Sequence, residues 1–463
     1  MRDLIVSLVL LAAMPTCFRK PFVGLLVFSL LAYMRLQDLT WGFAREVRWS
    51  FYVAIITFAG FFVSSREGRF LRYELRTVIM IALVAVVGLS LLSTRGADPA
   101  DLPGFVEFLK IVVIALFTTG MVRTRGRLRM ILWVIALSFA FFGFKNGLIG
   151  ILSGGTAIIL QGPGGMLRDN NDFALALAMS LPMLIMIGIS EKREVLRKSM
   201  LACVPLTVIT IGLTHSRGGF LALMTGVLML VVRSRNKLAG VSLLVLFGLA
   251  GVVLAPQGIK DRLASIQNYE DDSSATARLA AWRTAAVMIK ENPVFGVGFG
   301  HFEDNYHRYD PANTDRSLIK TKGFVAHNSY LQIWAECGTP AFLLYLSLIA
   351  LTLVDLWMLR ARAARRLASS WILNYTTMFE ASMVTFVVGS VFLNRAHFDL
   401  FYHWVALVLC FTTIAKQELD DPLQVQRDTG GGRGTLEEIA SAGFGRGGAP
   451  RGFGRRPATE GSF

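Results

Sequence analysis

The chain has 463 residues, of which 54% are hydrophobic and only 17% are charged, and its mean hydropathy is +0.52. Soluble domains carry roughly 25% charged residues, so this composition excludes a soluble globular enzyme, a small disulfide scaffold and a disordered chain. The net charge of +15 comes from Lys and Arg between apolar runs, which is typical of membrane topology rather than of nucleic-acid binding. The apolar runs are too long for the alternating strands of an outer-membrane barrel.

Thirteen apolar runs follow one another along the chain, and most approach the roughly 20 residues that a helix needs to cross a bilayer. We expect membrane-spanning helices over about residues 4–16, 22–35, 51–65, 75–94, 105–122, 130–152, 173–190, 199–215, 218–232, 238–255, 329–358, 372–393 and 400–415. The first two runs have only 13 and 14 residues, so they form either two spans or one interrupted hairpin. The sequence therefore predicts an all-α polytopic membrane protein with about 12–13 transmembrane helices.

The basic residues between these runs predict the orientation. Five loops hold 19 Lys and Arg together, at residues 66–76, 123–129, 192–198, 233–237 and 360–366. The short loops that alternate with them hold one each, namely Arg95, Arg168 and Arg395. Because strongly basic loops stay in the cytoplasm, the loops poor in Lys and Arg are expected on the outer face.

One connection is long and mostly polar. Residues 256–326 form a large extracytoplasmic loop, and residues 276–291 within it have a helical pattern that ends before Asn292-Pro293. A long loop with its own helix is usually functional. The predicted organisation is N-terminal transmembrane helices (1–255), this loop, C-terminal transmembrane helices (327–416) and a disordered, Gly/Arg-rich cytoplasmic tail (417–463).

Two arginines on the outer side are candidate phosphate ligands. Arg217 follows Ser216 in a Gly-containing turn between two spans, where a planar guanidinium can bind phosphate oxygens at the membrane surface. The alternative is an interfacial arginine that reaches lipid headgroups. Arg278 lies on the predicted loop helix, four residues before Trp282, and by itself would be an ordinary solvated charge.

The most informative stretch, HNSYLQIWAECGTPA (327–341), lies where the long loop re-enters the membrane. His327 can exchange a proton near neutral pH, which is the requirement for general acid–base catalysis. Asn328 or Ser329 is the expected N-cap of the following helix. A rigid helix end would therefore hold a candidate base at the membrane surface.

Three charged residues fall inside apolar runs. They are Glu336, Lys145 and Glu380. A charged side chain within the membrane is costly, and it is usually functional or paired. For Glu336 the alternative to a functional role is a hydrogen-bonded contact between helices.

A glycine-rich run, NPVFGVGFGHF (292–302), precedes that stretch. It is not a dinucleotide-binding fingerprint, because no apolar strand and helix surround Gly296, Gly298 and Gly300. We expect a turn that packs the large loop against the membrane helices.

Taken together, these motifs resemble the bacterial O-antigen ligase and O-antigen polymerase superfamily. His327-Asn328, nine residues and Gly338 resemble its signature, which is His-(Asn/Ser/Gln), nine residues and Gly, then two residues and Gly, Thr or Tyr. The last place is Ala341 here, a departure that concerns local helix packing and not His327.

Other segments match the superfamily in order and spacing. They are Ser216-Arg217-Gly218, Arg278 with Trp282, Asn292-Pro293 with the glycines that follow, and the outer segment 162–183 with Asn170-Asn171. The opening segment 19–43 resembles one branch, the exosortase A-associated O-glycosylation ligases.

The resemblance implies a glycosyltransferase of the bacterial inner membrane that uses neither a cofactor nor a metal. It would move a glycan en bloc from an undecaprenyl-diphosphate-type lipid carrier to an acceptor hydroxyl on the periplasmic face. The acceptor would be a lipid, a protein or a polysaccharide, and no nucleic acid would take part. The resemblance assigns His327 to catalysis at the acceptor and Arg217 and Arg278 to the donor diphosphate. Supporting roles are expected for Asn328, Glu336, Lys145, Arg168 and Asn171.

Three other functions remain open from the sequence. A polymerase of the same superfamily would join repeat units on lipid carriers, and its motifs do not differ from those of a ligase. A polysaccharide transporter would show internal symmetry with broken helices at the midplane. A non-catalytic partner of an export system would not depend on His327.

Overall fold

The structure is a computed structural model that describes residues 2–64, 68–93, 102–234, 237–238, 240–242, 273–313, 323–365, 370–394 and 396–421. The described residues form helices and turns and no β-strand beyond one isolated bridge. The helices, with 3-10 turns written η, are α1 (Arg2–Arg19), α2 (Pro21–Tyr33), η1 (Leu36–Leu39), η2 (Phe43–Arg45), α3 (Trp49–Ser64), α4 (Leu75–Ser93), α5 (Leu102–Met121), α6 (Arg125–Leu152), η4 (Gly165–Leu167), α7 (Asn170–Ser190), α8 (Glu194–Leu213), α9 (Arg217–Arg233), α12 (Ser273–Glu291), α13 (Phe302–Tyr309), α14 (Ser329–Arg365), α15 (Ser370–Gly389) and α16 (Asp399–Asp420).

Twelve of the thirteen apolar runs are helices, α1 to α9 and α14 to α16, while most of the run 238–255 lies outside the described residues. Among the described helices, seven are long and apolar enough to cross a membrane: α4, α5, α6, α7, α8, α14 and α16. The prediction of an all-α polytopic membrane protein is therefore confirmed. Seven is fewer than the 12–13 expected crossings, partly because α2 has only 13 residues, about 20 Å of helix against a bilayer core of about 30 Å.

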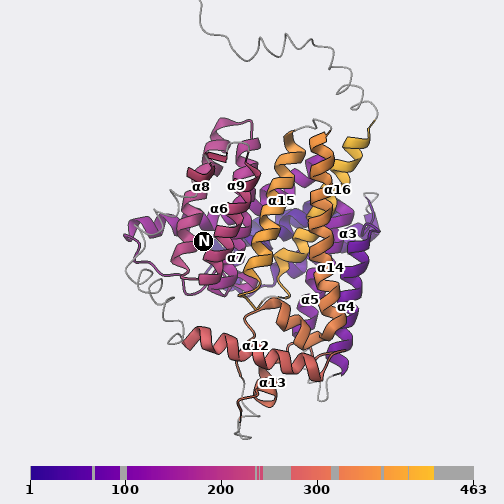
Figure 1. Cartoon of the computed structure of the whole chain (residues 1–463). Coiled ribbons are helices and arrows are strands. Elements are labelled where there is room, and N and C mark those ends of the chain that lie inside the picture. Colours follow the sequence, from indigo (N-terminus) through magenta and orange to yellow (C-terminus); the bar gives the residue numbers. More distant parts are fainter. Residues whose placement is uncertain are drawn as a thin grey trace, which may run out of the picture.

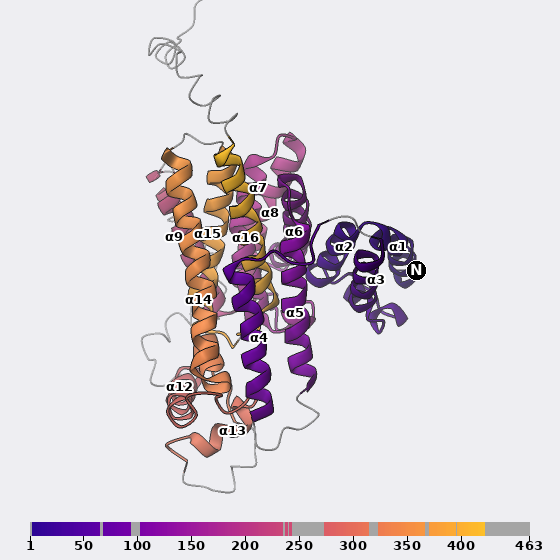
Figure 2. The ribbon, with the colours of Figure 1, turned by 90° about the vertical axis from the view of Figure 1, so that its right-hand side faces the viewer.

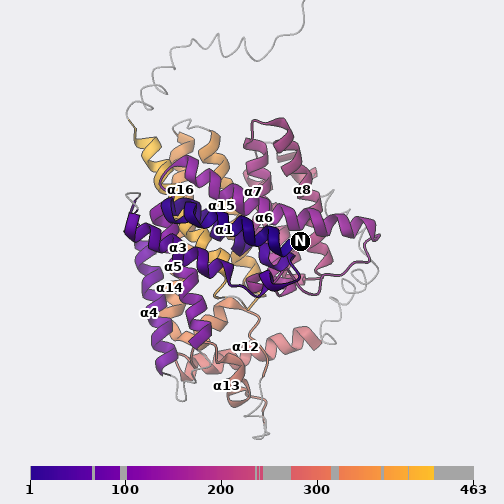
Figure 3. The same cartoon turned by 180° about the vertical axis from the view of Figure 1, so that it is seen from behind.

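The first three helices form a unit of their own, the N-terminal unit (residues 2–64). Figure 2 shows α1 to α3 at one side of the long helices, and Figure 3 shows α1 running across them. Close backbone approach holds the unit together, because a Cβ at Gly60 would lie within 3.0 Å of the Phe18 carbonyl. The Asp3 carboxylate accepts hydrogen bonds from the amides of Gly42 (2.9 Å) and Ala44 (3.2 Å), which closes the unit onto η2.

Charged residues of the basic loops meet at one end of the bundle, here called the basic end. The Glu380 side chain is fully buried there and forms ion pairs with Arg360 (2.8 Å) and Arg233 (2.9 Å). Arg76 of α4 forms an ion pair with Asp355 of α14 at 2.7 Å. Removing one partner of such a buried pair would strand a charge away from water, so these pairs tie α4, α9, α14 and α15 together. The charge of Glu380 within an apolar run is thus explained by pairing.

The opposite end, here called the loop end, carries α12 and α13; α12 lies across the long helices, and the short α13 lies next to it (Figure 1). The glycine-rich run seats this loop in a break of α14 at Gly338, whose φ is +79°. Amides of Val297 and Gly298 donate to the carbonyls of Ala335 (2.8 Å) and Glu336 (2.9 Å). A Cβ at Gly338 would clash with the Val294 carbonyl. The expected packing of this run against the membrane helices is confirmed.

The two ends predict a topology that reporter fusions can measure. Fusions at Gly164 and Asn305, near the loop end, should give an extracytoplasmic signal. Fusions at Arg125 and Arg362, near the basic end, should give a cytoplasmic one, because strongly basic loops are retained there. A cytoplasmic signal at Asn305 would contradict this orientation.

Candidate active site

Three helices begin close together at the loop end: α7, α9 and α14. Ser216 is the N-cap of α9, since its Oγ accepts a hydrogen bond from the Gly219 amide at 3.0 Å. The same hydroxyl donates to Asn171 Oδ1 of α7 at 2.7 Å, and Asn170 Nδ2 donates to the Thr214 carbonyl at 2.9 Å. The first turns of α7 and α9 are therefore joined by side-chain hydrogen bonds.

The start of α14 is joined to the same place through the turn that follows α15. The Ser329 amide donates to the Ser390 carbonyl at 2.9 Å, and its hydroxyl donates to the Leu393 carbonyl at 2.8 Å. A Cβ at Gly218, in the first turn of α9, would already lie 3.1 Å from Phe392 of that turn. Helix N-termini carry partial positive charge and free N–H groups, so this convergence favours an anion.

Arg217 is the first residue of α9, and its side chain is exposed. The sequence had indicated that the two glycines after Arg217 form an open turn for a ligand. In the structure they do not form such a turn. Instead both glycines are helical. Gly218 packs against Phe392, and a Cβ added at Gly219 would lie within 3.0 Å of the Ala174 side chain. Their small size therefore serves helix packing, which holds Arg217 at the convergence of the helix ends.

A hydrogen bond from α12 holds the chain next to His327. Trp282 Nε1 donates to the carbonyl of Ala326, the residue before His327, at 3.0 Å. Arg278 is four residues before Trp282 and so lies on the same face of α12. Arg283 is exposed and lies about 140° round the helix from Arg278, at 100° per residue.

His327 is half-buried and lies just outside α14, with the left-handed backbone φ of +47°. Asn328 is the N-cap of α14, because its Oδ1 accepts from the amides of Tyr330 (3.0 Å) and Leu331 (3.1 Å). A positive φ in a residue other than glycine is uncommon and persists only when the surroundings hold it. The cap and the Trp282 bond hold the backbone on either side of His327.

Burial lowers the pKa of His327 from its ordinary value, the charge of Arg278 lowers it further, and the charge of Asp169 raises it in part. One positive and one negative side chain therefore act electrostatically on the imidazole. Asp169 is also the N-cap of α7, since its Oδ1 accepts from the Asn171 amide at 2.8 Å. This arrangement favours a neutral imidazole at pH 7 that can accept a proton beside a carboxylate.

The remaining predicted residues fall into two groups. Asn171 and Asn328 have structural hydrogen bonds at the site, and the exposed Arg168 precedes Asp169. Lys145 is exposed on the surface of α6, so its charge is not buried within the bundle. Glu336 is buried in the seat of the loop, with Oε2 at 3.9 Å from Nε2 of His397, about 13 Å along α14 from His327.

Sequence reasoning missed Asp169 as a functional residue. The signal was present, because an aspartate directly before an apolar run is a typical helix N-cap. What the sequence could not supply was its position beside His327, which lies on a different helix end.

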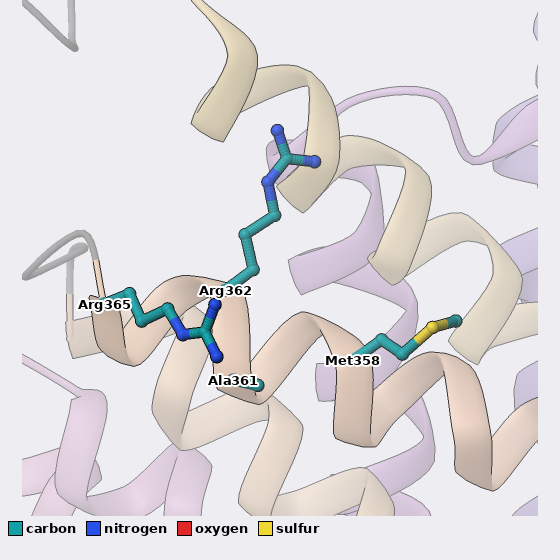
Figure 4. Close-up of a pocket in the computed structure, with 4 residues that line it drawn as sticks. All are labelled: Met358, Ala361, Arg362 and Arg365. Carbon is teal, nitrogen blue, oxygen red and sulfur yellow. The ribbon is translucent and has the colours of Figure 1, made fainter.

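A separate hollow of about 320 Å³ lies at the basic end (Figure 4) and is lined by Met358, Ala361, Arg362 and Arg365 of α14. Met358 comes 31 residues after His327, about 45 Å along the helix. This hollow therefore does not belong to the cluster around His327.

Residues 201–346 match a family model described as O-antigen ligase. This segment of the chain is similar to the O-antigen ligase family. The match includes Arg217, Arg278 and His327, and it confirms the predicted superfamily; it supports a glycosyltransferase of the ligase or polymerase type in a multi-pass membrane protein.

The chain also matches a second family model and one other protein. Residues 1–185 match a family of unknown function, which includes the whole N-terminal unit. An uncharacterized protein of Haemophilus influenzae is 24% identical over 220 residues, or 44% of this chain and 54% of that protein. The chain thus spans about half the length of this relative.

The charges around His327 predict its reactivity with diethyl pyrocarbonate, which modifies neutral imidazole. The modification of His327, followed by mass spectrometry across pH, should have its midpoint below the ordinary histidine value of about 6.5. Arg278→Ala should raise this midpoint because a positive charge is lost. Asp169→Asn, which keeps an N-cap side chain, should lower it further. A midpoint above about 6.5 in the wild-type protein would contradict the assignment of these charges to His327.

Proposed function

We propose that this protein transfers a glycan en bloc from an undecaprenyl-diphosphate-type lipid to an acceptor hydroxyl at the loop end. The observation that carries the proposal is that the charges of Arg278 on α12 and of Asp169, the N-cap of α7, both act on His327, at the start of a helix that is joined to the starts of α7 and α9. The loop end would be the periplasmic face of the bacterial inner membrane, because the paired basic residues lie at the opposite end. The family match supports a lipid-linked glycan and an acceptor as partners in general.

The donor would bind through its diphosphate. A polyprenyl chain confines the donor to the bilayer, so the diphosphate lies at the membrane surface, where Arg217 begins α9. Arg217 and Arg278 would each bind phosphate oxygens as a planar fork, and the helix N-termini would add partial positive charge. As the bond to the sugar breaks, negative charge grows on the diphosphate, and these groups would stabilise it without a metal ion.

His327 would act on the acceptor. Its neutral imidazole takes the proton of the acceptor hydroxyl while that oxygen bonds to the anomeric carbon and the lipid diphosphate leaves. A positioned base contributes typically about 10²–10⁴-fold to such a step. Asp169 would stabilise the imidazolium that forms, which parallels the role of a carboxylate next to a catalytic histidine.

The supporting residues have different roles in this proposal. Asn328 holds the backbone of His327 by capping α14, and Asn171 holds Ser216 next to Arg217. Arg168 is exposed beside Asp169 and would meet the donor or acceptor from the outer loop. Glu336 would support the seat of the large loop, and Lys145 would reach lipid headgroups from α6.

A polymerase of the same superfamily is the second candidate, and the family match supports it equally. Purified protein with a lipid-linked single repeat unit and no other acceptor separates the two. A ladder of products indicates a polymerase, whereas product only after addition of a separate acceptor indicates a ligase.

The two arginines predict that lysine, although it conserves the charge, cannot replace either of them. Arg217→Lys and Arg278→Lys should each lower kcat/KM for the donor, because an ammonium keeps the charge but loses the planar fork. Loss of one charge-assisted hydrogen bond is worth about 1.5–3 kcal/mol, or roughly ten- to a hundredfold. Steady-state transfer assays with purified variants give the measurement.

Arg283→Ala is the matched control, since Arg283 is exposed on another side of the same helix. It should retain activity close to that of the unmodified protein. An equal loss in Arg283→Ala and Arg278→Ala would overturn the assignment within α12. Full inactivation by EDTA, reversed by a divalent ion, would contradict the metal-independent step.

For His327, binding and turnover should separate. His327→Ala should abolish transfer while the variant still inserts and still binds the lipid diphosphate donor, because the ring serves the acceptor. His301→Ala and His307→Ala are controls on the same loop and should be much milder; His301 Nδ1 instead lies 2.9 Å from the Phe299 carbonyl. Loss of donor binding in His327→Ala would show that His327 is a phosphate ligand or has a structural role. Wild-type turnover in this variant would exclude His327 from catalysis.

A further inference from the structure

Three residues other than glycine have a positive φ among those the structure describes: Arg35, His215 and His327. His215 directly precedes the N-cap of α9, and His327 precedes the N-cap of α14. Strained backbone of this kind costs of order 1–3 kcal/mol and gathers at functional sites. Arg35, with φ +52°, belongs to the N-terminal unit's connection to α3 and not to the O-antigen ligase match.

The guanidinium of Arg35 lies against the outer loop that leads to α7. A Cβ added at Gly165 would lie within 3.0 Å of Arg35 Nη1, and one at Gly164 would lie 3.5 Å from Arg35 Nε. Both glycines have a positive φ, which is +116° at Gly164 and +54° at Gly165. The backbone of this turn therefore takes a shape that only glycine allows easily, and it does so where the guanidinium is seated.

The guanidinium is itself held in place. Arg35 Nε forms an ion pair with Asp38 of η1, and the side chains of both are largely buried, with 23% and 16% exposed. Arg45 Nε lies 4.0 Å from the other Asp38 oxygen, but its side chain is 64% exposed. Asp38 thus fixes Arg35, while Arg45 is only a peripheral neighbour of the pair.

The turn at Gly164 and Gly165 is part of a short closed loop, residues 161–169. The Gly162 amide donates to the Arg168 carbonyl at 2.8 Å, and Gln161 and Asp169 form an isolated antiparallel bridge. Asp169, the last residue of the loop, is the N-cap of α7 and acts on His327. Arg35 therefore contacts the middle of the loop that carries the carboxylate of the site.

We propose that Arg35 is a positioning residue of this active site, which holds the loop 161–169 so that Asp169 stays beside His327. The inference rests on the proposed function, and it extends that function to the N-terminal unit. The unit that matches a family of unknown function is then part of the active-site architecture rather than a separate membrane anchor. Lysine cannot replace Arg35, because a single ammonium cannot both pair with Asp38, as Nε does, and lie against Gly165, as Nη1 does.

The test uses the full-length protein in lipid nanodiscs and the variants Arg35→Ala, Arg35→Lys and Gly165→Ala, with Arg45→Ala as the matched control. Two quantities are measured: transfer kinetics, and the pH midpoint of His327 modification by diethyl pyrocarbonate. In the Arg35 and Gly165 variants we expect kcat to fall by about ten- to a hundredfold, the effect of misplacing a catalytic group by roughly 1 Å. The donor KM should change much less, and the midpoint should fall because Asp169 moves away from His327. Arg45→Ala should match the wild-type protein in both its transfer kinetics and its modification midpoint.

The second readout separates this inference from the proposed function, because histidine modification needs no turnover. An unchanged midpoint and an unchanged kcat in Arg35→Ala would overturn the positioning role. A lowered midpoint in Arg35→Ala, together with wild-type transfer by His327→Ala, would overturn the proposed catalysis and keep the link between Arg35 and Asp169. Gly165→Ala adds a single methyl group, so it tests the same contact if Arg35→Ala does not fold.

Discussion

The positions of Arg278 and His327 at the loop end depend on the seat of the large loop in α14. Backbone hydrogen bonds from Val297 and Gly298 fill a break at Gly338, and the bond from Trp282 to Ala326 continues the attachment up to His327. Backbone amides and carbonyls must find partners when they are buried, so a break in a membrane helix is stable only where another segment satisfies it. The loop supplies that segment, and in return it receives a rigid position that sets Arg278 next to His327.

The charges of the molecule are divided between its two ends. At the basic end, the buried carboxylates of Glu380 and Asp355 are matched by arginines, which serves packing. At the loop end, the starts of α7, α9 and α14 meet, and the charges of a carboxylate and a guanidinium act with opposite signs on one histidine. Together with the match to O-antigen ligases, this division explains how one bundle can bury charge for stability at one end and present it for chemistry at the other.

Much of the fold could be predicted from the sequence because its signals are local. Apolar runs gave the helices, and the polar residues at 328–329 gave the cap of α14, which the structure assigns to Asn328. The contacts that build the site are not local: Ser216 bonds to Asn171 across 45 residues and Trp282 to Ala326 across 44. The place of Asp169 beside His327 and the seat of Arg35 on Gly165 follow from such packing, so periodicity and spacing could not indicate them. The short helix α13 was also missed, because eight polar and aromatic residues show no apolar run.

We infer that a diphosphate binds at the convergence of the helix starts, with His327 on the acceptor side. A structure of the protein in nanodiscs with an unreactive undecaprenyl diphosphate analogue tests this most directly. We expect phosphate density between Arg217 and Arg278, within about 3 Å of both guanidinium groups, with the His327 ring facing the position of the leaving sugar. Phosphate density at the basic end, in the hollow lined by Arg362 and Arg365, with none near Arg217, would contradict it.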